Sequence, residues 1–457
     1  MLDEVVPIGQ RSFALQATRR FQPGATDRRS RPAADAVETM KPHITMLTTF
    51  YPPYNFGGDG IGVQRLSTAL AKYGFDITIV HNADAYLMQA KKEPPPAPPP
   101  PEGIRVVSLT SDLGTTASLI THQTGRPLAH HSQLKQLLSP ETTDVTWFHN
   151  VSLVGGPGLL SYGAGLKIYE AHEHWLVCPS HVLWRFDREL CDSRQCLKCV
   201  LSYKRPPQMW RYTGYLDRQA REVDLFIAKS EFSRAKHREF GFKQDMKVAP
   251  YFLPDANAED IAAGPAHDKP FFLFVGRLEK IKGVQDIIPT FAGETGTDLV
   301  IIGDGEYAAT LREQAKGMPR VKFLGRKPPE SLPPFYRDAL ALITPSLCFE
   351  TFGIVLIEAF RLGLPVIARR LGPFPEIIEK ARAGLLFETE AELREAIGAL
   401  EKDSHRRAEM SRTAKQSFVT HWSEAAVMRR YFKLLEDAAR RKGLSQLADI
   451  FKERSLS

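Results

Sequence analysis

Two glutamates separated by seven residues are the sharpest chemical feature of the sequence. Glu350 and Glu358 lie in the segment PSLCFETFGIVLIEAFRLGLPVIA, residues 345–368. We expect Glu350 in the loop after a strand and Glu358 on the second turn of the next helix, facing the same pocket rim. The helix start between them should expose backbone amides suited to a diphosphate, namely those of Phe352, Gly353 and Ile354. A Glu pair at this spacing would also suit an ordinary surface helix, so the neighbouring motifs must distinguish a ligand site from a surface helix.

Two cations precede this segment in the loop that follows an apolar strand. GRLEKIKG, residues 276–283, contains Arg277 and Lys282. Two fixed cations can neutralise the charge of a departing nucleoside diphosphate, although each alone would suit a solvated basic loop. The next strand ends in GDGE, where Gly303 and Gly305 would let a base or ribose approach the backbone closely.

A glycine-rich loop stands near the beginning of the chain in NFGGDGIG, residues 55–62. Its glycines permit close approach to a phosphate, and we single out Gly57, Gly58 and Gly62. The loop would also suit a dinucleotide, but it lacks the G-x-G-x-x-G spacing and no acidic residue closes the next strand. A nicotinamide site is therefore disfavoured. His149 follows another strand, DVTWF, and would also suit a satisfied histidine at a strand end.

The elements that must hold these residues form two alternating β/α series. In the first series we expect strands at 43–51, 76–82, 104–109, 144–150, 166–172 and 224–230. In the second series we expect them at 271–277, 298–305, 321–325, 340–346 and 365–370. Strands alternating with helices predict an α/β fold, here two doubly wound Rossmann-like domains facing across a cleft.

The same patterns predict how the chain divides. We expect a disordered leader at 1–40, an N-terminal domain at 41–250, a linker at 251–270, a second domain at 271–423 and a C-terminal helix at 424–457 that could cross back to the first domain. The net charge of +7 suits anionic surfaces, phosphorylated ligands and nucleic acid, but the basic residues are dispersed and form no aromatic-rich nucleic-acid module. No transmembrane run or signal core appears, which predicts a cytoplasmic protein.

Four of the five cysteines gather in an insertion at 175–205. Cys178, Cys191, Cys196 and Cys199 give the spacing C-x12-C-x4-C-x2-C. Four thiolates are the usual complement of a structural zinc site, while buried cysteines without a metal are the alternative. Cys348, beside Glu350, is better explained by packing than as a nucleophile.

Taken together, GRLEKIKG, IIGDGE, VKFLG and the Glu350–Glu358 segment resemble the retaining glycosyltransferases of the two-Rossmann type, the glycosyltransferase-B fold with the E-x7-E signature. The resemblance to these group 1, family 4-like enzymes runs from about residue 43 to 435. It implies that Arg277 and Lys282 bind donor phosphates, Glu358 the ribose and Glu350 the transferred sugar. It further implies that the helix amides cap the diphosphate, that the glycine-rich loop approaches donor and acceptor, and that His149 contacts the donor sugar.

The resemblance also implies the reaction and its partners. The donor would be a nucleotide sugar, with UDP or GDP favoured, and the acceptor a glycan, a lipid-linked glycan or a small molecule in cell-surface polysaccharide or glycoconjugate biosynthesis. The domain at 41–250 would hold the acceptor and the domain at 271–423 the donor. No catalytic metal would be needed, and peripheral contact with the inner face of a membrane would suit a lipid-linked acceptor. His172 and Glu173 occupy the places of a family His-Asp pair, and Glu173 departs from that pattern.

Two alternatives share this architecture. A nucleotide-sugar 2-epimerase would use the same donor pocket without an acceptor, and incubation of the donor alone would reveal the epimer. A non-catalytic scaffold should have lost the phosphate cations or the glutamates, and all four are present.

Overall fold

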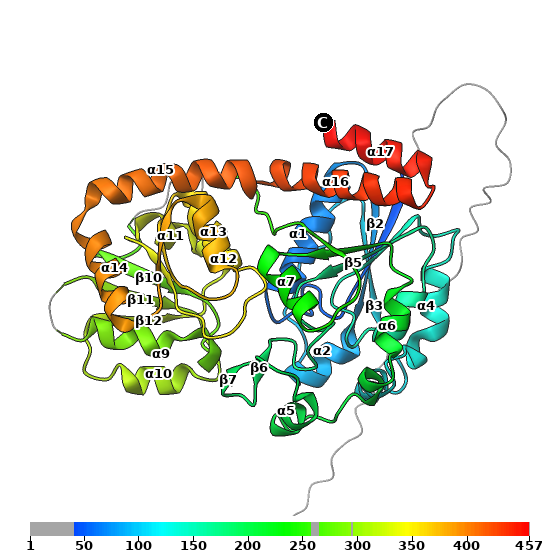
Figure 1. Cartoon of the computed structure of the whole chain (residues 1–457), viewed down its shortest axis with the longest axis horizontal. Coiled ribbons are helices and arrows are strands. Elements are labelled where there is room, and N and C mark those ends of the chain that lie inside the picture. The colour runs from blue at the N-terminus through cyan, green and yellow to red at the C-terminus, as the bar shows by residue number, and fades with distance from the viewer. Residues whose placement is uncertain (1–40, 257–264, 294–295, 457) are drawn as a thin grey trace, which may run out of the picture. The chain divides into compact units, whose positions relative to one another are not determined.

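The computed structural model describes residues 41–256, 265–293 and 296–456 (Figure 1). The expected leader at 1–40 lies outside the described residues, as does part of the expected linker at 251–270.

The first sheet is seven-stranded and entirely parallel, with the order β3-β2-β1-β4-β5-β8-β9. Its strands are β1 (His43–Thr48), β2 (Asp76–Asn82), β3 (Ile104–Leu109), β4 (Val145–Phe148), β5 (Leu166–Ala171), β8 (Leu225–Ala228) and β9 (Met246–Val248). All six expected strands are present. The three-residue edge strand β9 was not expected, because its short stretch has no long apolar run.

The second sheet has six parallel strands in the order β12-β11-β10-β13-β14-β15. Its strands are β10 (Phe271–Val275), β11 (Asp298–Ile302), β12 (Val321–Gly325), β13 (Leu342–Thr344), β14 (Val366–Arg369) and β15 (Gly384–Phe387). In each sheet the first strand lies in the interior. The next two strands extend the sheet to one edge, and the later strands extend it to the other edge. The prediction of two doubly wound Rossmann-like domains is confirmed.

Helices cover both faces of each sheet. Those associated with the first are α1 (Gly58–Lys72), α2 (Ala83–Ala90), α3 (Thr115–Thr124), α4 (His131–Leu137), α5 (Cys196–Ser202), α6 (Tyr215–Ala220) and α7 (Glu231–Glu239). Those associated with the second are α9 (Val284–Ile287), α10 (Ala308–Gln314), α11 (Pro333–Asp338), α12 (Ile354–Leu362), α13 (Phe374–Ala381), α14 (Glu390–Lys402) and α15 (Ser404–His421). The Cys-rich insertion carries α5 and a small hairpin of β6 (Trp184–Arg185) and β7 (Glu189–Leu190).

Each sheet separates two apolar cores, because successive side chains of a strand point to opposite faces. In β1, Ile44 and Met46 belong to one core and Leu47 to the other. The strands read as nearly continuous apolar runs, as expected for parallel strands covered on both sides. Among the described helices, none combines the length and apolar character needed to cross a bilayer.

The C-terminal region differs from the single helix that the sequence indicates. Two helices, α16 (Glu424–Arg441) and α17 (Ser445–Leu456), are separated by a turn in which Gly443 has φ +79°. Helix α15 buries Phe418 in the second domain, whereas α16 buries Phe432 in a core of the first. The expectation that the C-terminal region returns to the first domain is therefore met by α16, and Figure 1 shows α15 and α16 following one another.

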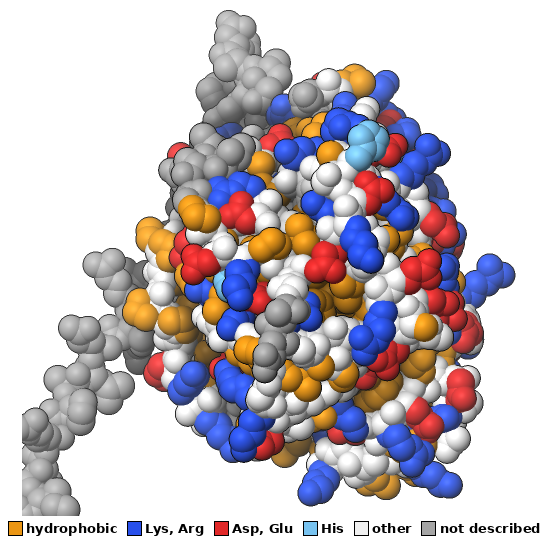
Figure 2. Space-filling model, turned by 90° about the vertical axis from the view of Figure 1, so that its left-hand side faces the viewer, with side chains coloured by type: hydrophobic (Ala, Val, Ile, Leu, Met, Phe, Trp, Pro, Cys, Tyr) orange, Lys and Arg blue, Asp and Glu red, His pale blue; other side chains and the backbone are white. Residues whose placement is uncertain are grey.

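The face of the second domain seen in Figure 2 carries Lys and Arg side chains interspersed with Asp and Glu.

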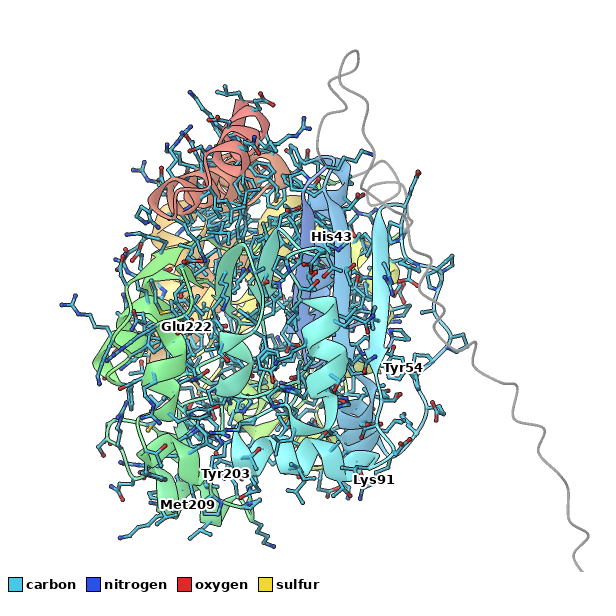
Figure 3. The ribbon with its side chains drawn as sticks, turned by 90° about the vertical axis from the view of Figure 1, so that its right-hand side faces the viewer. His43, Tyr54, Lys91, Tyr203, Met209 and Glu222 are labelled. Atoms are coloured by element: carbon cyan, nitrogen blue, oxygen red, sulfur yellow. The ribbon has the colours of Figure 1, made fainter. Side chains whose placement is uncertain are left out.

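In the first domain, His43 lies at one end of the sheet, whereas Tyr203 and Met209 lie at the opposite end (Figure 3). The Cys-rich insertion thus lies toward the carboxyl ends of the first-domain strands.

Because α16 completes a core of the first domain, we expect Phe432→Ala to lower the free energy of unfolding by about 3–5 kcal/mol. Phe432 is fully buried and lies against Tyr73, Phe75 and Phe451. Urea denaturation of the purified chain measures the change. Arg429→Ala, at an exposed position of the same helix, is the control and should change stability by less than about 0.5 kcal/mol. Equal effects of the two substitutions would show that α16 is not part of the core.

Candidate functional site

The topology brings the predicted cations and glutamates together. In the second sheet the chain leaves β10 toward one edge and returns to β13 beside β10. Ligands of doubly wound sheets bind at such a switch point, outside the carboxyl ends of the strands. The loop after β10 carries Arg277 and Lys282, and the loop after β13 carries Glu350. In the first sheet, the glycine-rich loop and His149 follow the adjacent strands β1 and β4 in the same way.

Lys282 and Glu350 form an ion pair across the second switch point. Lys282 Nζ lies 2.7 Å from Glu350 Oε1, which also accepts a hydrogen bond from Ser346 at 3.1 Å. Burial alone would raise the pKa of Glu350, but the Lys282 cation outweighs it and the pKa lies below its ordinary value. Burial likewise disfavours the Lys282 cation, and Glu350 reverses the effect and raises its pKa. Both groups are therefore charged at neutral pH.

Arg277 is the more exposed of the two predicted cations. Its side chain is 57% exposed and contacts Glu279 at 2.7 Å. Its charge also acts on both members of the Lys282–Glu350 pair. An exposed ion pair of this kind is weak, so Arg277 is free to turn toward an anionic ligand.

The helix start that was predicted to bind an anion lies one or two residues later than expected. Helix α12 starts at Ile354, Gly353 is its N-cap, and Phe352 lies outside it with a buried side chain. Gly353 has φ +104°, and a Cβ there would lie 2.6 Å from the Phe374 ring. Only glycine fits this position without strain. The first helical amide facing outward is therefore that of Ile354, not that of Phe352.

Glu358 lies on the second turn of α12, as predicted, and has partners from two domains. Tyr336 donates a hydrogen bond to Glu358 Oε2 at 2.8 Å. Arg65, on α1 of the first domain, lies 3.9 Å from Glu358 Oε1. Neither Arg65 nor Tyr336 was singled out in the sequence, because only the fold brings them to this carboxylate.

Of the glycines predicted in the first domain, Gly57 and Gly58 lie at the start of α1, whereas Gly62 is buried inside this helix. Gly58 starts α1, and a Cβ there would lie 3.5 Å from Ile354 Cδ1, so the glycine-rich loop meets the start of α12. A Cβ at Gly57 would meet only Asp59, at 3.8 Å. Gly62 differs from expectation: it is buried inside α1, where a Cβ would lie 2.5 Å from the Tyr251 ring. Packing against Tyr251 accounts for Gly62.

The turn after β11 is likewise explained by packing. A Cβ at Gly303 would lie 1.8 Å from the Gly276 carbonyl oxygen, and one at Gly305 would lie 2.4 Å from that of Leu278. The Leu278 amide donates to the Asp304 carbonyl at 3.0 Å. These glycines let the two loops of the second domain touch backbone to backbone, and this contact positions the segment that carries Arg277.

His149 is enclosed by the protein instead of open to a ligand. Its side chain is 0% exposed, and its Nδ1 is hydrogen-bonded to His172 Nε2 at 2.9 Å. Burial, with His172 and Lys229 nearby, lowers the pKa of His149 far below its usual value, so the ring is neutral. His149 Nε2 is buried without a hydrogen-bond partner in the described part of the chain. In this conformation His149 does not line an open site, which departs from the expected contact with the donor sugar.

A buried charged network lies beneath His149. Glu170 on β5 pairs with Lys229, which follows β8, and Tyr431 of α16 donates to Glu170 Oε1 at 2.7 Å. Lys229 Nζ also contacts the Tyr431 hydroxyl at 2.8 Å and lies 4.4 Å from the centre of the Tyr251 ring. The network thus joins α16 to the strand ends of the first domain. Charged residues inside or directly after the apolar strands LKIYEA and LFIA were the sequence signal for it.

The same network continues to the loop that carries Glu350. Tyr251 is hydrogen-bonded to His172 Nδ1 at 2.5 Å, and its ring packs edge-on against Phe352. Thr351 donates to the His172 carbonyl at 2.9 Å, and its own carbonyl accepts from Ser230 at 2.6 Å. The predicted donor-binding loop is therefore fixed directly to the first domain.

Two acids of the first domain lie near this junction. Burial raises the pKa of Asp59, with a further contribution from Glu173, while Asn150 donates to its Oδ2 at 3.4 Å. Glu173 pairs with His181 at 2.7 Å. Asp59 lies inside the glycine-rich motif, where its acidic side chain is the sequence signal for this site.

The four cysteines of the predicted zinc site lie near one another, since Cys178, Cys196 and Cys199 all contribute to the raised pKa of Cys191. Sulfurs around a tetrahedral zinc ion lie about 3.8 Å apart. In the described ranges, no three thiols have their sulfur atoms within 4.8 Å of one another. Cys178 instead contacts Ser180, Cys191 contacts the Ser193 carbonyl, and the amide of Phe186 donates to Cys199. Burial first, and then the neighbouring cysteines, raise the pKa of Cys191 to about 11. Zinc binding by these four cysteines stays a prediction.

The three groups that do lie within 4.8 Å are His149, Glu170 and His172. The carboxylate of Glu170 already neutralises Lys229, and the two rings bind one another. This cluster is accounted for as part of the buried network.

Comparisons with known proteins agree with the fold. Residues 256–417 match the family model "Glycosyl transferases group 1". Sucrose-phosphate synthase from Thermosynechococcus elongatus superposes with a TM-score of 0.65 at 19% identity, covering 87% of this chain and 100% of that one. HepE of Anabaena, solved with UDP-glucose, gives 0.59 at 17% identity, covering 86% and 99%. The chain therefore has the glycosyltransferase-B fold, and residues 256–417 are similar to the glycosyl transferases group 1 family.

Curated relatives match over different lengths. N-acetyl-alpha-D-glucosaminyl L-malate synthase of Bacillus anthracis is 28% identical over 42% of this chain and 51% of its own length. Glycogen synthase of Mycobacterium tuberculosis H37Rv is 25% identical over 75% of this chain and 81% of its own. The chain spans about half or less of the first curated relatives that it matches.

The conformation of Gly353 predicts a specific cost of adding a side chain. We expect Gly353→Ala to lower the free energy of unfolding by about 1–3 kcal/mol, because alanine disfavours the positive φ and its Cβ would collide with Phe374. Gly398→Ala is the control, since Gly398 lies within α14 and a Cβ there meets nothing within 4 Å. That substitution should be neutral or stabilising. Thermal and urea unfolding measure both variants, and equal stability of Gly353→Ala and wild type would contradict the assigned backbone.

The buried network predicts non-additive substitutions. Lys229→Met should lower the free energy of unfolding by about 3–5 kcal/mol, because it leaves the Glu170 carboxylate buried without its cation. The double variant Lys229→Met/Glu170→Gln should be more stable than Lys229→Met alone, because neither charge is then stranded. Urea unfolding of the four proteins completes the double-mutant cycle. Additive effects would show that the two charges do not interact.

Proposed function

We propose that the chain is a retaining, metal-independent glycosyltransferase that transfers a sugar from a nucleotide-sugar donor. The observation that carries this proposal is the meeting of Lys282, Glu350 and the start of α12 at one switch point, with Arg277 beside them. The group 1 family match over residues 256–417 supports the same activity.

The second domain supplies what a nucleoside diphosphate leaving group requires. Lys282 and Arg277 would offset the negative charge that grows on the diphosphate as the glycosidic bond breaks, and the α12 amides would add the partial charge of a helix start. Glu350 keeps Lys282 charged and oriented before the donor arrives. Fixed cations and amides of this kind can take the neutralising role that a divalent metal has in other transferases.

Glu358 is suited to recognise the donor's ribose. Its carboxylate is held on α12 by the hydrogen bond from Tyr336 and lies 3.9 Å from Arg65. Two neighbouring ribose hydroxyls can donate to one carboxylate. Among nucleotide sugars we favour UDP- and then GDP-sugars, and the structural similarity to HepE with UDP-glucose supports this order.

The acceptor would bind on the first domain. Asp59 and Glu173 lie near the glycine-rich loop that meets α12, and a hydroxyl entering there would approach the donor from the first-domain side. We propose a glycan or lipid-linked acceptor in cell-surface polysaccharide or glycoconjugate synthesis, at the cytoplasmic face of a membrane. Retention would follow front-side attack, in which the leaving phosphate helps to deprotonate the acceptor hydroxyl and no protein nucleophile is needed.

Donor binding should appear as protection against thermal unfolding in the presence of EDTA. A ligand at a hundredfold excess over its Kd stabilises the folded chain by about 2.7 kcal/mol. We expect a UDP- or GDP-sugar to raise Tm while other nucleotide sugars do not. Glu358→Ala should weaken donor binding about tenfold, and Arg277→Ala should mainly slow transfer, by about a hundredfold.

Glu313→Ala, at an exposed position of α10, is the control for these variants and should behave as wild type. Unchanged kinetics in both Glu358→Ala and Arg277→Ala would remove the site assignment. Conversion of the donor to an epimer in the absence of acceptor would identify a 2-epimerase instead.

A further inference from the structure

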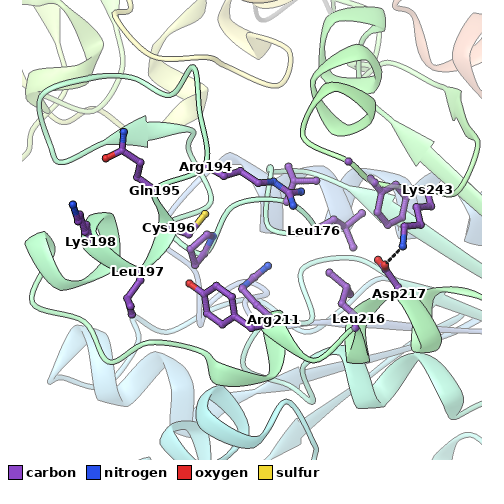
Figure 4. A pocket seen from close by; sticks show the side chains of 16 residues that line it. Leu176, Arg194, Gln195, Cys196, Leu197, Lys198, Arg211, Leu216, Asp217 and Lys243 are labelled. Atoms are coloured by element: carbon purple, nitrogen blue, oxygen red, sulfur yellow. Dashed lines mark hydrogen bonds and ion pairs between the residues drawn. The ribbon is translucent and has the colours of Figure 1, made fainter.

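A separate pocket lies in the first domain, between the Cys-rich insertion and the segment that follows it. Its volume is about 670 Å³ (Figure 4). Leu176, Val177 and Phe242 are buried and form apolar walls, while Arg194 and Lys243 stand at exposed positions of the rim. None of these residues belongs to the proposed donor site.

The charge of the pocket is strongly positive. Arg194, Lys198, Arg211 and Lys243 line it together with one acid, Asp217. Lys243 is paired with Asp217 at 2.5 Å, as the dashed line in Figure 4 marks. Three cations remain without an ion pair in the part of the chain that the structure describes. An anion is therefore the ligand that this lining favours.

Neighbouring side chains fix the position of the Arg211 guanidinium. Its Nε donates to Gln208 at 2.5 Å, and its guanidinium stacks over the rings of Trp210 and Trp175 at 4.6 and 5.3 Å. Its Nη2 is buried without a hydrogen-bond partner among the described residues. Burial lowers the pKa of Arg211 to about 10, so it stays charged at neutral pH. Figure 4 shows the side chain rising toward the middle of the pocket.

The surface around the pocket is both apolar and basic. Leu197, Leu201, Met209 and Tyr212 are between 48% and 61% exposed, and they cluster on α5 and on a 3-10 turn, η3 (Met209–Tyr212). Residues 194–218 contain six Lys or Arg and one acid. Exposed apolar side chains among cations are what an anionic membrane surface attracts.

We propose that this pocket binds the phosphate group of a membrane-anchored amphiphile, with α5 and η3 resting in the lipid surface. Arg211 and Arg194 bind the phosphate, Lys198 and the basic rim face anionic headgroups, and Leu176, Val177 and Phe242 contact the first part of the apolar chain. The occupant is a lipid phosphate rather than free phosphate, because half of the lining is apolar.

The role of this pocket in acceptor binding rests on the proposed function. Leu176 and Val177 follow Glu173 by three and four residues, and Phe349 of the donor-side loop packs against the apolar core that contains them. A lipid phosphate held here would bring its attached sugar to the acceptor side. The transferase would then act on a lipid-linked phosphorylated acceptor.

Titration of the purified chain with dodecyl phosphate, below its micellar concentration, tests the pocket by Trp fluorescence, since Trp175 and Trp210 lie against Arg211. We expect saturable binding that Arg211→Gln weakens at least about tenfold and the exposed Arg194→Gln about fivefold. Arg188→Gln removes an equally exposed charge of the same insertion that does not line the pocket, and should bind like wild type. Flotation with phosphatidylcholine vesicles, with and without phosphatidic acid, should show binding only with phosphatidic acid.

Three results would overturn the inference: equal affinity for inorganic phosphate and dodecyl phosphate, equal loss in Arg188→Gln and Arg194→Gln, or no preference for phosphatidic acid. The first would identify a site for soluble phosphate. Thermal protection of the wild type by nucleotide sugars is measured separately. Loss of that protection would defeat the proposed function, whereas failure of lipid binding alone would defeat only this inference.

Discussion

The rest of the structure depends on the adjacency of β10 and β13 in the second sheet. Glu350 lies 68 positions after Lys282, yet the switch in strand order puts their loops side by side and allows the ion pair at 2.7 Å. Parallel strands expose their carboxyl ends at one edge, so the cations, the glutamate and the start of α12 must share that edge. Close backbone contacts at Gly303 and Gly305 then fix the loop that carries Arg277.

The first domain is attached to this edge by buried polar contacts as well as by apolar packing. Glu170, Lys229 and Tyr431 join two strand ends to α16, and His172 and Tyr251 extend the network to Thr351 and Phe352. Buried charges of this kind are costly unless every partner is present. The crossing of the chain into α16 therefore does more than cover a core, because the Tyr431 hydroxyl donates to the buried Glu170 carboxylate.

Much of this architecture follows from sequence, and the limits have a physical cause. Apolar strands alternating with helices predict both sheets. The order of the strands in such a sheet then brings together the loops that carry the cation and glutamate motifs, so the sequence also predicts which loops meet. The sequence does not show whether a glycine faces a ligand or a neighbour: Gly62 lies against Tyr251, a contact between residues far apart in the chain. The burial of His149 and the exact distances among the four thiols also depend on tertiary packing, which spacing does not encode.

The most direct test of the central claim is a crystal structure of the chain with UDP in the presence of EDTA. We expect the diphosphate to lie within hydrogen-bonding distance of Lys282 Nζ and the first amides of α12, with the ribose at Glu358 and no metal between them. A diphosphate bound on another surface, or one that binds only through a divalent cation, would contradict it.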